Sequence, residues 1–187
     1  MMPVNIIVLN GSSCSGKTTL ARALQEVFSD PYLRLGVDIV HAMLPDRFRD
    51  WNNPNNEKMV KRALAGMHRS AATMADAGNY IILDTVLVNR AAILECAQAL
   101  TLHRAFLIGV FCDENELQKR ADARGEGLAE IALQQARHIH AHGHYDLKLN
   151  TTGKAPGIMA EQIKHMVESK IAPTAFDKLR AMQGNSI

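Results

Sequence analysis

Gly11-Ser12-Ser13-Cys14-Ser15-Gly16-Lys17-Thr18 fills every position of the pattern G-x-x-x-x-G-K-[ST]. The β-branched apolar run at residues 4–10 precedes it and predicts a buried strand. After it, apolar residues recur at helical spacing and predict one face of a helix: Leu20, Leu24, Val27 and Phe28. A glycine-containing loop between a strand and a helix is the context in which this pattern binds phosphate.

The residue types in this loop explain why it suits a triphosphate. The two glycines permit backbone conformations that a Cβ would block, so successive N–H groups can point at phosphate oxygens. The N-terminus of the following helix adds its partial positive charge. We predict that Lys17 reaches the β- and γ-phosphates and that the Thr18 hydroxyl ligates Mg²⁺. ATP with Mg²⁺ is the expected ligand, and the residues expected to contact the nucleotide are Gly11, Ser12, Ser13, Cys14, Ser15, Gly16, Lys17, Thr18 and Thr19.

Composition narrows the possible partners and surroundings. With 187 residues, we expect a single domain over residues 1–187 with a substantial core. The net charge is +2, and no block of basic residues is interleaved with aromatics, so neither nucleic acid nor a membrane is expected as a partner. The first residues predict a core strand rather than a cleavable leader, so a cytoplasmic location is expected. Three scattered cysteines predict neither disulfides nor a zinc site.

Two further predicted strands end on acidic residues. Residues 32–37 predict a strand that ends at Asp38, and residues 80–84 predict one that ends at Asp84. Ligands bind at the carboxyl ends of strands in open α/β sheets. We expect Asp84 to orient Mg²⁺, directly or through water. Asp38 suits a helix N-cap as well as a ligand contact, and its position alone does not separate these two interpretations.

A pair of arginines follows the fourth predicted strand, which covers the apolar residues 105–112. Asp113 is expected to begin a helix that carries Arg120 and Arg124, and a second helix is expected from about residue 128 to 142. We predict that residues 113–142 form a lid whose arginines close over the phosphates. Surface arginines on a solvated helix are the alternative.

The remaining segments are less specific. Polar residues 46–56 predict a mobile loop, in which Trp51 could contact a substrate or hold the loop to the body. Residues 57–77 predict a long helix, and residues 38–78 form the expected acceptor side. The alternating histidines at 138, 140, 142 and 144 lack a completing acid or cysteine, so a metal site is not expected there. Residues 146–150 predict a fifth strand, residues 151–154 an adenine-side loop, residues 157–167 a last helix, and the tail past Pro173 a peripheral segment.

Five strands alternating with helices predict a three-layer α/β/α domain with a five-stranded, mostly parallel sheet. Several segments resemble the chloramphenicol phosphotransferase-like P-loop kinases. These are the phosphate loop, Leu35-Gly36-Val37-Asp38, Gly109-Val110-Phe111-Cys112-Asp113, Gln135 through His140 to Tyr145-Asp146, and Asn150-Thr151-Thr152.

The resemblance implies a P-loop kinase fold and ATP-dependent phosphorylation of a hydroxyl on a small molecule, with antibiotic resistance as an associated role. Asp38 falls at the position of the family's proposed catalytic base, and a carboxylate there can accept the hydroxyl proton. This chain has Gly127 where the family's lid carries a further arginine, and its stretch between Asp38 and Tyr80 is shorter and differs in residues. The acceptor therefore stays open.

Two alternatives remain from the sequence. One is a nucleoside, nucleotide or metabolite kinase of the shikimate or gluconate kinase type, which an acceptor screen with ATP would identify. The other is a nucleotide-dependent switch or binding module, for which ATP turnover would not respond to any small alcohol.

Overall fold

A computed structural model describes residues 5–50, 53–125, 127–169 and 171–184 of the chain. Its centre is a five-stranded sheet in the order β2-β3-β1-β4-β5, in which all four described pairings are parallel. The strands are β1 (Ile6–Asn10), β2 (Tyr32–Gly36), β3 (Tyr80–Thr85), β4 (Ala105–Phe111) and β5 (Leu147–Asn150). The predicted parallel sheet is confirmed.

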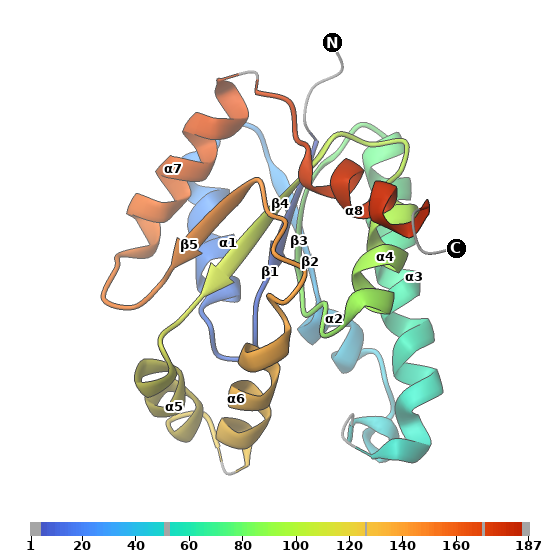
Figure 1. Cartoon of the computed structure of the whole chain (residues 1–187), viewed down its shortest axis with the longest axis vertical. Coiled ribbons are helices and arrows are strands. Elements are labelled where there is room, and N and C mark those ends of the chain that lie inside the picture. The colour runs from blue at the N-terminus through green and yellow to red at the C-terminus, as the bar shows by residue number, and fades with distance from the viewer. Residues whose placement is uncertain (1–4, 51–52, 126, 170, 185–187) are drawn as a thin grey trace.

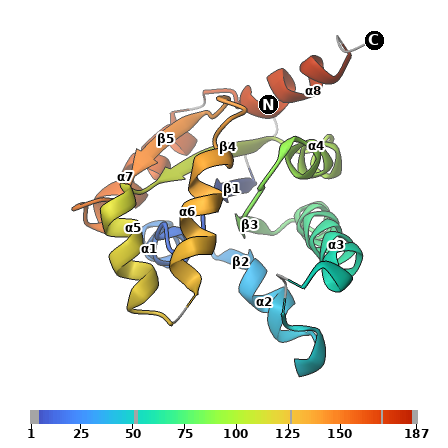
Figure 2. The ribbon, with the colours of Figure 1, turned by 60° about the horizontal axis from the view of Figure 1, so that its bottom comes forward.

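Helices cover both faces of this sheet (Figure 1). One face carries α1 (Lys17–Val27) and α7 (Pro156–Glu168). The other carries α3 (Glu57–Asp76), α4 (Arg90–Ala99) and α8 (Ala175–Gly184). Beyond the carboxyl ends of the strands lie α2 (Val37–Ala42), α5 (Glu114–Asp122) and α6 (Leu128–His138), as Figure 2 shows. Two short 3-10 helices, Asp46–Phe48 and Pro54–Asn56, lie in the predicted polar loop; Trp51 lies outside the described residues.

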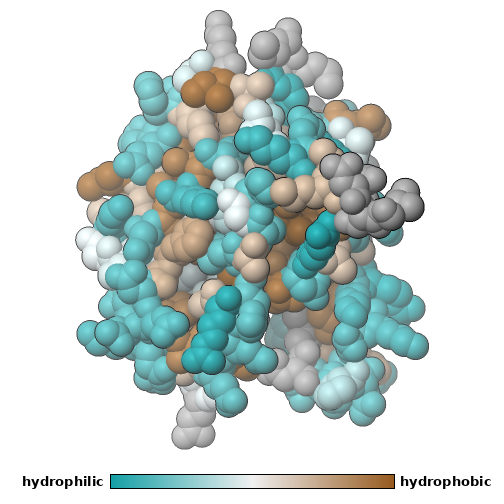
Figure 3. Space-filling view, viewed as in Figure 1, coloured by the Kyte–Doolittle hydropathy of each residue, from teal (hydrophilic) through white to brown (hydrophobic). Residues whose placement is uncertain are grey.

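Alternation along the buried strands explains the three layers. In β1, Ile6 and Val8 pack toward α3, α4 and α8, whereas Ile7 and Leu9 pack toward α1 and α7. All four side chains are fully buried, as expected for a strand covered on both faces. On the face shown in Figure 3, hydrophilic residues predominate, and hydrophobic residues appear as smaller patches among them. No helix in the described part of the chain is long and apolar enough to cross a membrane.

The prediction of a peripheral tail past Pro173 is wrong. The tail forms α8, and Ala175, Phe176 and Leu179 are buried in the cluster shared with α4. Asp146 holds this helix in place: its Oδ1 accepts hydrogen bonds from the N–H groups of Thr174 (2.7 Å) and Ala175 (3.0 Å). Its Oδ2 accepts one from the N–H of Leu107 (2.9 Å), so one carboxylate joins α8 to β4.

We expect Asp146→Ala to lower the free energy of unfolding by about 2 kcal/mol, because three backbone N–H groups lose a charged acceptor. Urea unfolding would measure this. Asp177→Ala is the matched control in the same helix; its exposed carboxylate pairs with part-buried Arg180, which keeps its hydrogen bond to the Ala97 carbonyl oxygen in the variant, so the effect should stay within about 0.5 kcal/mol. Equal losses in the two variants would contradict the role given to Asp146.

Two element boundaries differ from those predicted. α2 begins at Val37 with Gly36 at the N-cap, so Asp38 lies in the first turn of the helix and is not its cap. Val37 looked like a strand residue because it is β-branched, but it packs from α2 against the core. α6 ends at His138 rather than at residue 142, because Ile139 turns into the core, 1% exposed. The later histidines therefore do not share a helix face.

Candidate active site

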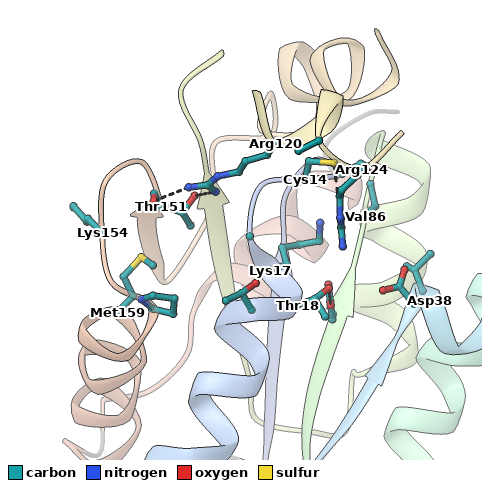
Figure 4. A pocket seen from close by; sticks show the side chains of 17 residues that line it. Cys14, Lys17, Thr18, Asp38, Val86, Arg120, Arg124, Thr151, Lys154 and Met159 are labelled. Atoms are coloured by element: carbon teal, nitrogen blue, oxygen red, sulfur yellow. Dashed lines mark hydrogen bonds between the residues drawn. The ribbon is translucent and has the colours of Figure 1, made fainter. Parts of the chain in front are cut away.

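A cavity of about 450 Å³ opens at the carboxyl ends of the strands. It is lined by the phosphate loop, the start of α2, the end of β3, the end of α5 and the start of α7 (Figure 4). The structure brings together there the predicted residues Ser13, Cys14, Gly16, Lys17, Thr18, Thr19, Asp38, Asp84, Arg120 and Arg124. Of the other predicted loop residues, Gly11, Ser12 and Ser15 are buried beneath the loop surface.

Close packing fixes the phosphate loop. A Cβ on Gly11 would lie 2.3 Å from the carbonyl oxygen of Val110, so only glycine fits beside β4. Gly16 has φ +95°, a left-handed conformation that favours glycine. Cys14 is a non-glycine residue with positive φ, 61°. The conformation of the loop is therefore set by the left-handed backbone at Cys14 and Gly16 and by close packing against β4.

Lys17 lies inside the loop and is only 6% exposed. Its ammonium donates a hydrogen bond to the Ser12 carbonyl oxygen over 2.7 Å. Burial lowers the pKa of Lys17 below its usual range, while the nearby carboxylates of Asp84 and Asp38 oppose that shift. An anion placed beside this nitrogen would favour its charged form further.

Thr18 and Asp84 meet at the floor of the cavity. The Thr18 hydroxyl donates a 2.6 Å hydrogen bond to Asp84 Oδ2. A hydroxyl and a carboxylate side by side are the hard oxygen donors that Mg²⁺ prefers, so this pair fits the predicted ion. Arg34 Nη1 lies 4.0 Å from the same carboxylate oxygen. No group of three or more His, Cys, Asp or Glu residues in the described ranges could hold a metal ion by itself.

Asp38 faces the phosphate loop from α2. Its side chain is exposed, lines the cavity and lies across from Lys17 and Thr18 in Figure 4. Within the described ranges, its carboxylate has no hydrogen-bond partner. A carboxylate that is both free and turned into a cavity is available to a ligand.

The two predicted arginines differ in their surroundings. Arg120 is held in place: it donates hydrogen bonds to Glu116 (2.9 Å), to the Thr151 hydroxyl (2.9 Å) and to the Thr151 carbonyl oxygen (3.2 Å). Arg124 lies just past the end of α5, and its Nη1 lies 3.9 Å from Cys14 Sγ. Figure 4 shows the Arg124 guanidinium pointing into the cavity between Lys17 and Asp38.

Part of the cavity lining was not predicted from the sequence. Thr151 and Lys154 belong to the predicted adenine-side loop, but Pro156 and Met159 of α7, which also line the cavity, were not predicted. The apolar residues Val37, Val86 and Ala123 line the same cavity as Asp38 and Arg124. Asp113 occupies the N-cap position of α5, but its side chain makes no capping bond and accepts a hydrogen bond from Asn150 instead.

The segment from His140 to Tyr145 lies behind the phosphate loop rather than in the cavity. Burial lowers the pKa of His140 to about 4 and raises that of Tyr145 above its usual range. The Tyr145 hydroxyl can therefore donate to neutral His140 Nδ1 (2.7 Å) while it accepts from Asn10 Nδ2 (2.9 Å). Asn10 Oδ1 in turn accepts from the Leu87 N–H over 2.9 Å. This network supports the start of the loop.

Two solved structures illustrate the fold that this chain shares with known proteins. Shikimate kinase from Acinetobacter baumannii in complex with shikimate has a TM-score of 0.63 at 14% identity, over 89% of this chain and 94% of that chain. APS kinase from Mycobacterium tuberculosis in complex with AMPPNP and APS has a TM-score of 0.65 at 15% identity, over 89% and 99%. At these identities the likeness concerns the fold, which is that of P-loop kinases.

A relative in Mycobacterium tuberculosis strain H37Rv, provisionally named an O-phosphotransferase, is 24% identical over 196 residues. The match covers 94% of this chain and 87% of the relative. The family model described as chloramphenicol phosphotransferase-like protein matches residues 4–168. With most of its length matched, the chain belongs to the chloramphenicol phosphotransferase-like family of P-loop phosphotransferases.

Proposed function

We propose that this protein transfers the γ-phosphate of ATP to a hydroxyl group of a small uncharged molecule. The observation that carries the proposal is the placement of a free carboxylate, Asp38, opposite Lys17 and Thr18 in one cavity. The loop supplies the donor half of a two-substrate site, and α2 supplies the acceptor half. The AMPPNP in the APS kinase complex, bound to a protein of the same fold, supports ATP as the donor.

Each residue has one task in this proposal. Lys17 binds the β- and γ-phosphates, and Thr18 and Asp84 hold Mg²⁺, which neutralises phosphate charge when bound. Asp38 accepts the proton of the acceptor hydroxyl while the oxygen of that hydroxyl forms a bond to the γ-phosphorus. The bond from that phosphorus to the β,γ-bridging oxygen breaks, and ADP leaves with the electron pair. Little covalent help is required, so positioning and charge supply most of the rate.

The placement of charges favours an uncharged acceptor. Lys17 and Arg124 lie together, and such a pair of cations suits a triphosphate between them. Arg120 is engaged with Thr151, and Lys154 lies on the adenine side. On the Asp38 side of the cavity, the lining residues that the structure describes are Asp38, Arg124 and the apolar Val37, Val86 and Ala123. The Asp38 carboxylate would repel an acceptor that carries its own phosphate or carboxylate, and Arg124, a cation that could offset that repulsion, is assigned to the triphosphate.

We also propose that α5 and α6 form a lid, within a single domain, and that Arg124 acts from it. Arg124 is the arginine free to spread over developing phosphate charge, because Nε, Nη1 and Nη2 of Arg120 each already donate a hydrogen bond to Glu116 or Thr151. Arg120 then fixes the lid to the loop after β5.

An acceptor screen tests the proposal. Purified protein with ATP and Mg²⁺ is offered three panels: neutral alcohols and antibiotics with hydroxyl groups, carboxylated or phosphorylated metabolites, and nucleosides with their monophosphates. We expect acceptor-dependent ADP release with the first panel. Turnover confined to nucleoside monophosphates or to anionic metabolites would overturn the proposed acceptor class. Slow ATP hydrolysis unaffected by every compound would favour a nucleotide-dependent switch.

A further inference from the structure

The first of two contacts between the phosphate loop and α6 is a hydrogen bond. The backbone N–H of Ser13 donates to Gln135 Oε1 over 2.8 Å, across 122 positions of sequence. Because a backbone N–H can only donate, the side-chain oxygen rather than the amide nitrogen of Gln135 must face the loop. Ser13 also lines the nucleotide cavity, so the bond joins the cavity wall to α6.

The second contact is apolar and comes from the next loop residue. Cys14 is buried in a small cluster with Leu117 and Ala121 of α5 and Ala132 of α6. Its left-handed backbone, φ 61°, turns the chain at this position. Two consecutive loop residues are thus held by the two helices, one through its backbone and one through its side chain.

These contacts also bear on Arg124. Its Nη1 lies 3.9 Å from Cys14 Sγ, and its guanidinium points into the cavity. Arg124 directly follows α5, and its backbone N–H donates to the Ala121 carbonyl oxygen over 3.0 Å, so its position is tied to that of α5. The position of the Arg124 guanidinium in the cavity therefore depends on the contacts that hold α5 and α6 against Ser13 and Cys14.

We propose that Gln135 is a positioning residue for phosphoryl transfer: by accepting from the Ser13 N–H it holds α6 on the phosphate loop and thereby places Arg124 over the γ-phosphate. The proposal rests on the proposed function for its catalytic consequence. The holding of α6 on the loop does not require any acceptor and can be measured without one.

The test compares Gln135→Ala, Gln135→Glu and the control Gln134→Ala, an exposed neighbour on the same helix. Hydrogen exchange of α5 and α6 is followed in the nucleotide-free protein. Gln135→Ala should raise exchange there, since the acceptor oxygen is lost. Gln135→Glu keeps an acceptor oxygen and should exchange like the parent, as should Gln134→Ala.

Kinetics then separate positioning from a purely structural role. Gln135→Ala should lower kcat by about 3- to 10-fold, the worth of one neutral hydrogen bond, with little change in the KM for ATP. In an Arg124→Ala background, the same substitution should cost less than about 2-fold, because the residue through which Gln135 acts is gone. Where no acceptor has been found, the rate of ATP hydrolysis serves as the readout.

Three outcomes would overturn the inference. The first is unchanged hydrogen exchange of α5 and α6 in Gln135→Ala. The second is a loss of kcat that adds fully to the loss caused by Arg124→Ala. The third is increased exchange over the whole sheet together with a lower Tm, which would indicate a general loss of stability. Failure of the proposed function looks different: no compound is phosphorylated, yet exchange of α5 and α6 still responds to Gln135→Ala and not to Gln134→Ala.

Discussion

Replacing Lys17 by alanine is expected to lower the rate of phosphoryl transfer by about 10³-fold or more, the loss of a buried charge aimed at the transferred group. Lys17 is 6% exposed, and its ammonium is already oriented by the Ser12 carbonyl oxygen. ADP release in the presence of an acceptor measures the rate, and titration with AMPPNP measures nucleotide affinity, which should also fall.

The matched control for this prediction is Lys148→Ala. Lys148 is exposed on β5 and outside the cavity, so its removal should leave the rate within about 2-fold of the parent. A Lys17→Ala protein that is folded and retains a tenth or more of the parent rate would remove this residue from the donor site.

Replacing Asp38 by asparagine is the second large effect that we expect. The substitution keeps the shape of the side chain but removes the group that accepts the hydroxyl proton, so kcat should fall by about 10²-fold or more. AMPPNP affinity should stay within about 2-fold, because Asp38 lies on the acceptor side and has no hydrogen-bond partner in the described ranges to lose. Single-turnover measurements with saturating ATP report the chemical step.

Asp30→Asn, at an exposed position between α1 and β2, is the control for loss of one negative charge. Asp38→Glu keeps the carboxylate but displaces it by one methylene, so its rate should lie between those of the parent and Asp38→Asn. If Asp38→Asn retained full activity, this residue would have no part in proton transfer, and the base would have to be sought elsewhere on the acceptor side.

Most of the sheet could be predicted from sequence because its strands are covered on both faces. Such strands are continuous apolar runs, as in residues 105–111, and their ends follow from the polar residues after them. The start of α2 could not be predicted in this way, because Val37 has the residue type of a strand but packs as part of a helix. Tertiary contact, not local preference, decided its conformation.

The site was predictable to the extent that its residues belong to local patterns. Lys17 and Thr18 come from one motif, and Asp38 and Asp84 from the ends of neighbouring strands. Gln135 and Asp146 act on backbone N–H groups that lie 122 and 28 to 39 positions away. A backbone N–H is present at nearly every position, so no residue type in the sequence marks it as a partner.

The position of α8 has a practical consequence for expression and domain assignment. The family match ends at residue 168, whereas Phe176 and Leu179, which pack in one cluster with Ile93 and Leu100 of the α4 region, come later. A protein shortened to the family boundary would leave that apolar side of α4 uncovered and prone to self-association. The limits of the family match are therefore narrower than the packed core, which includes residues of α8.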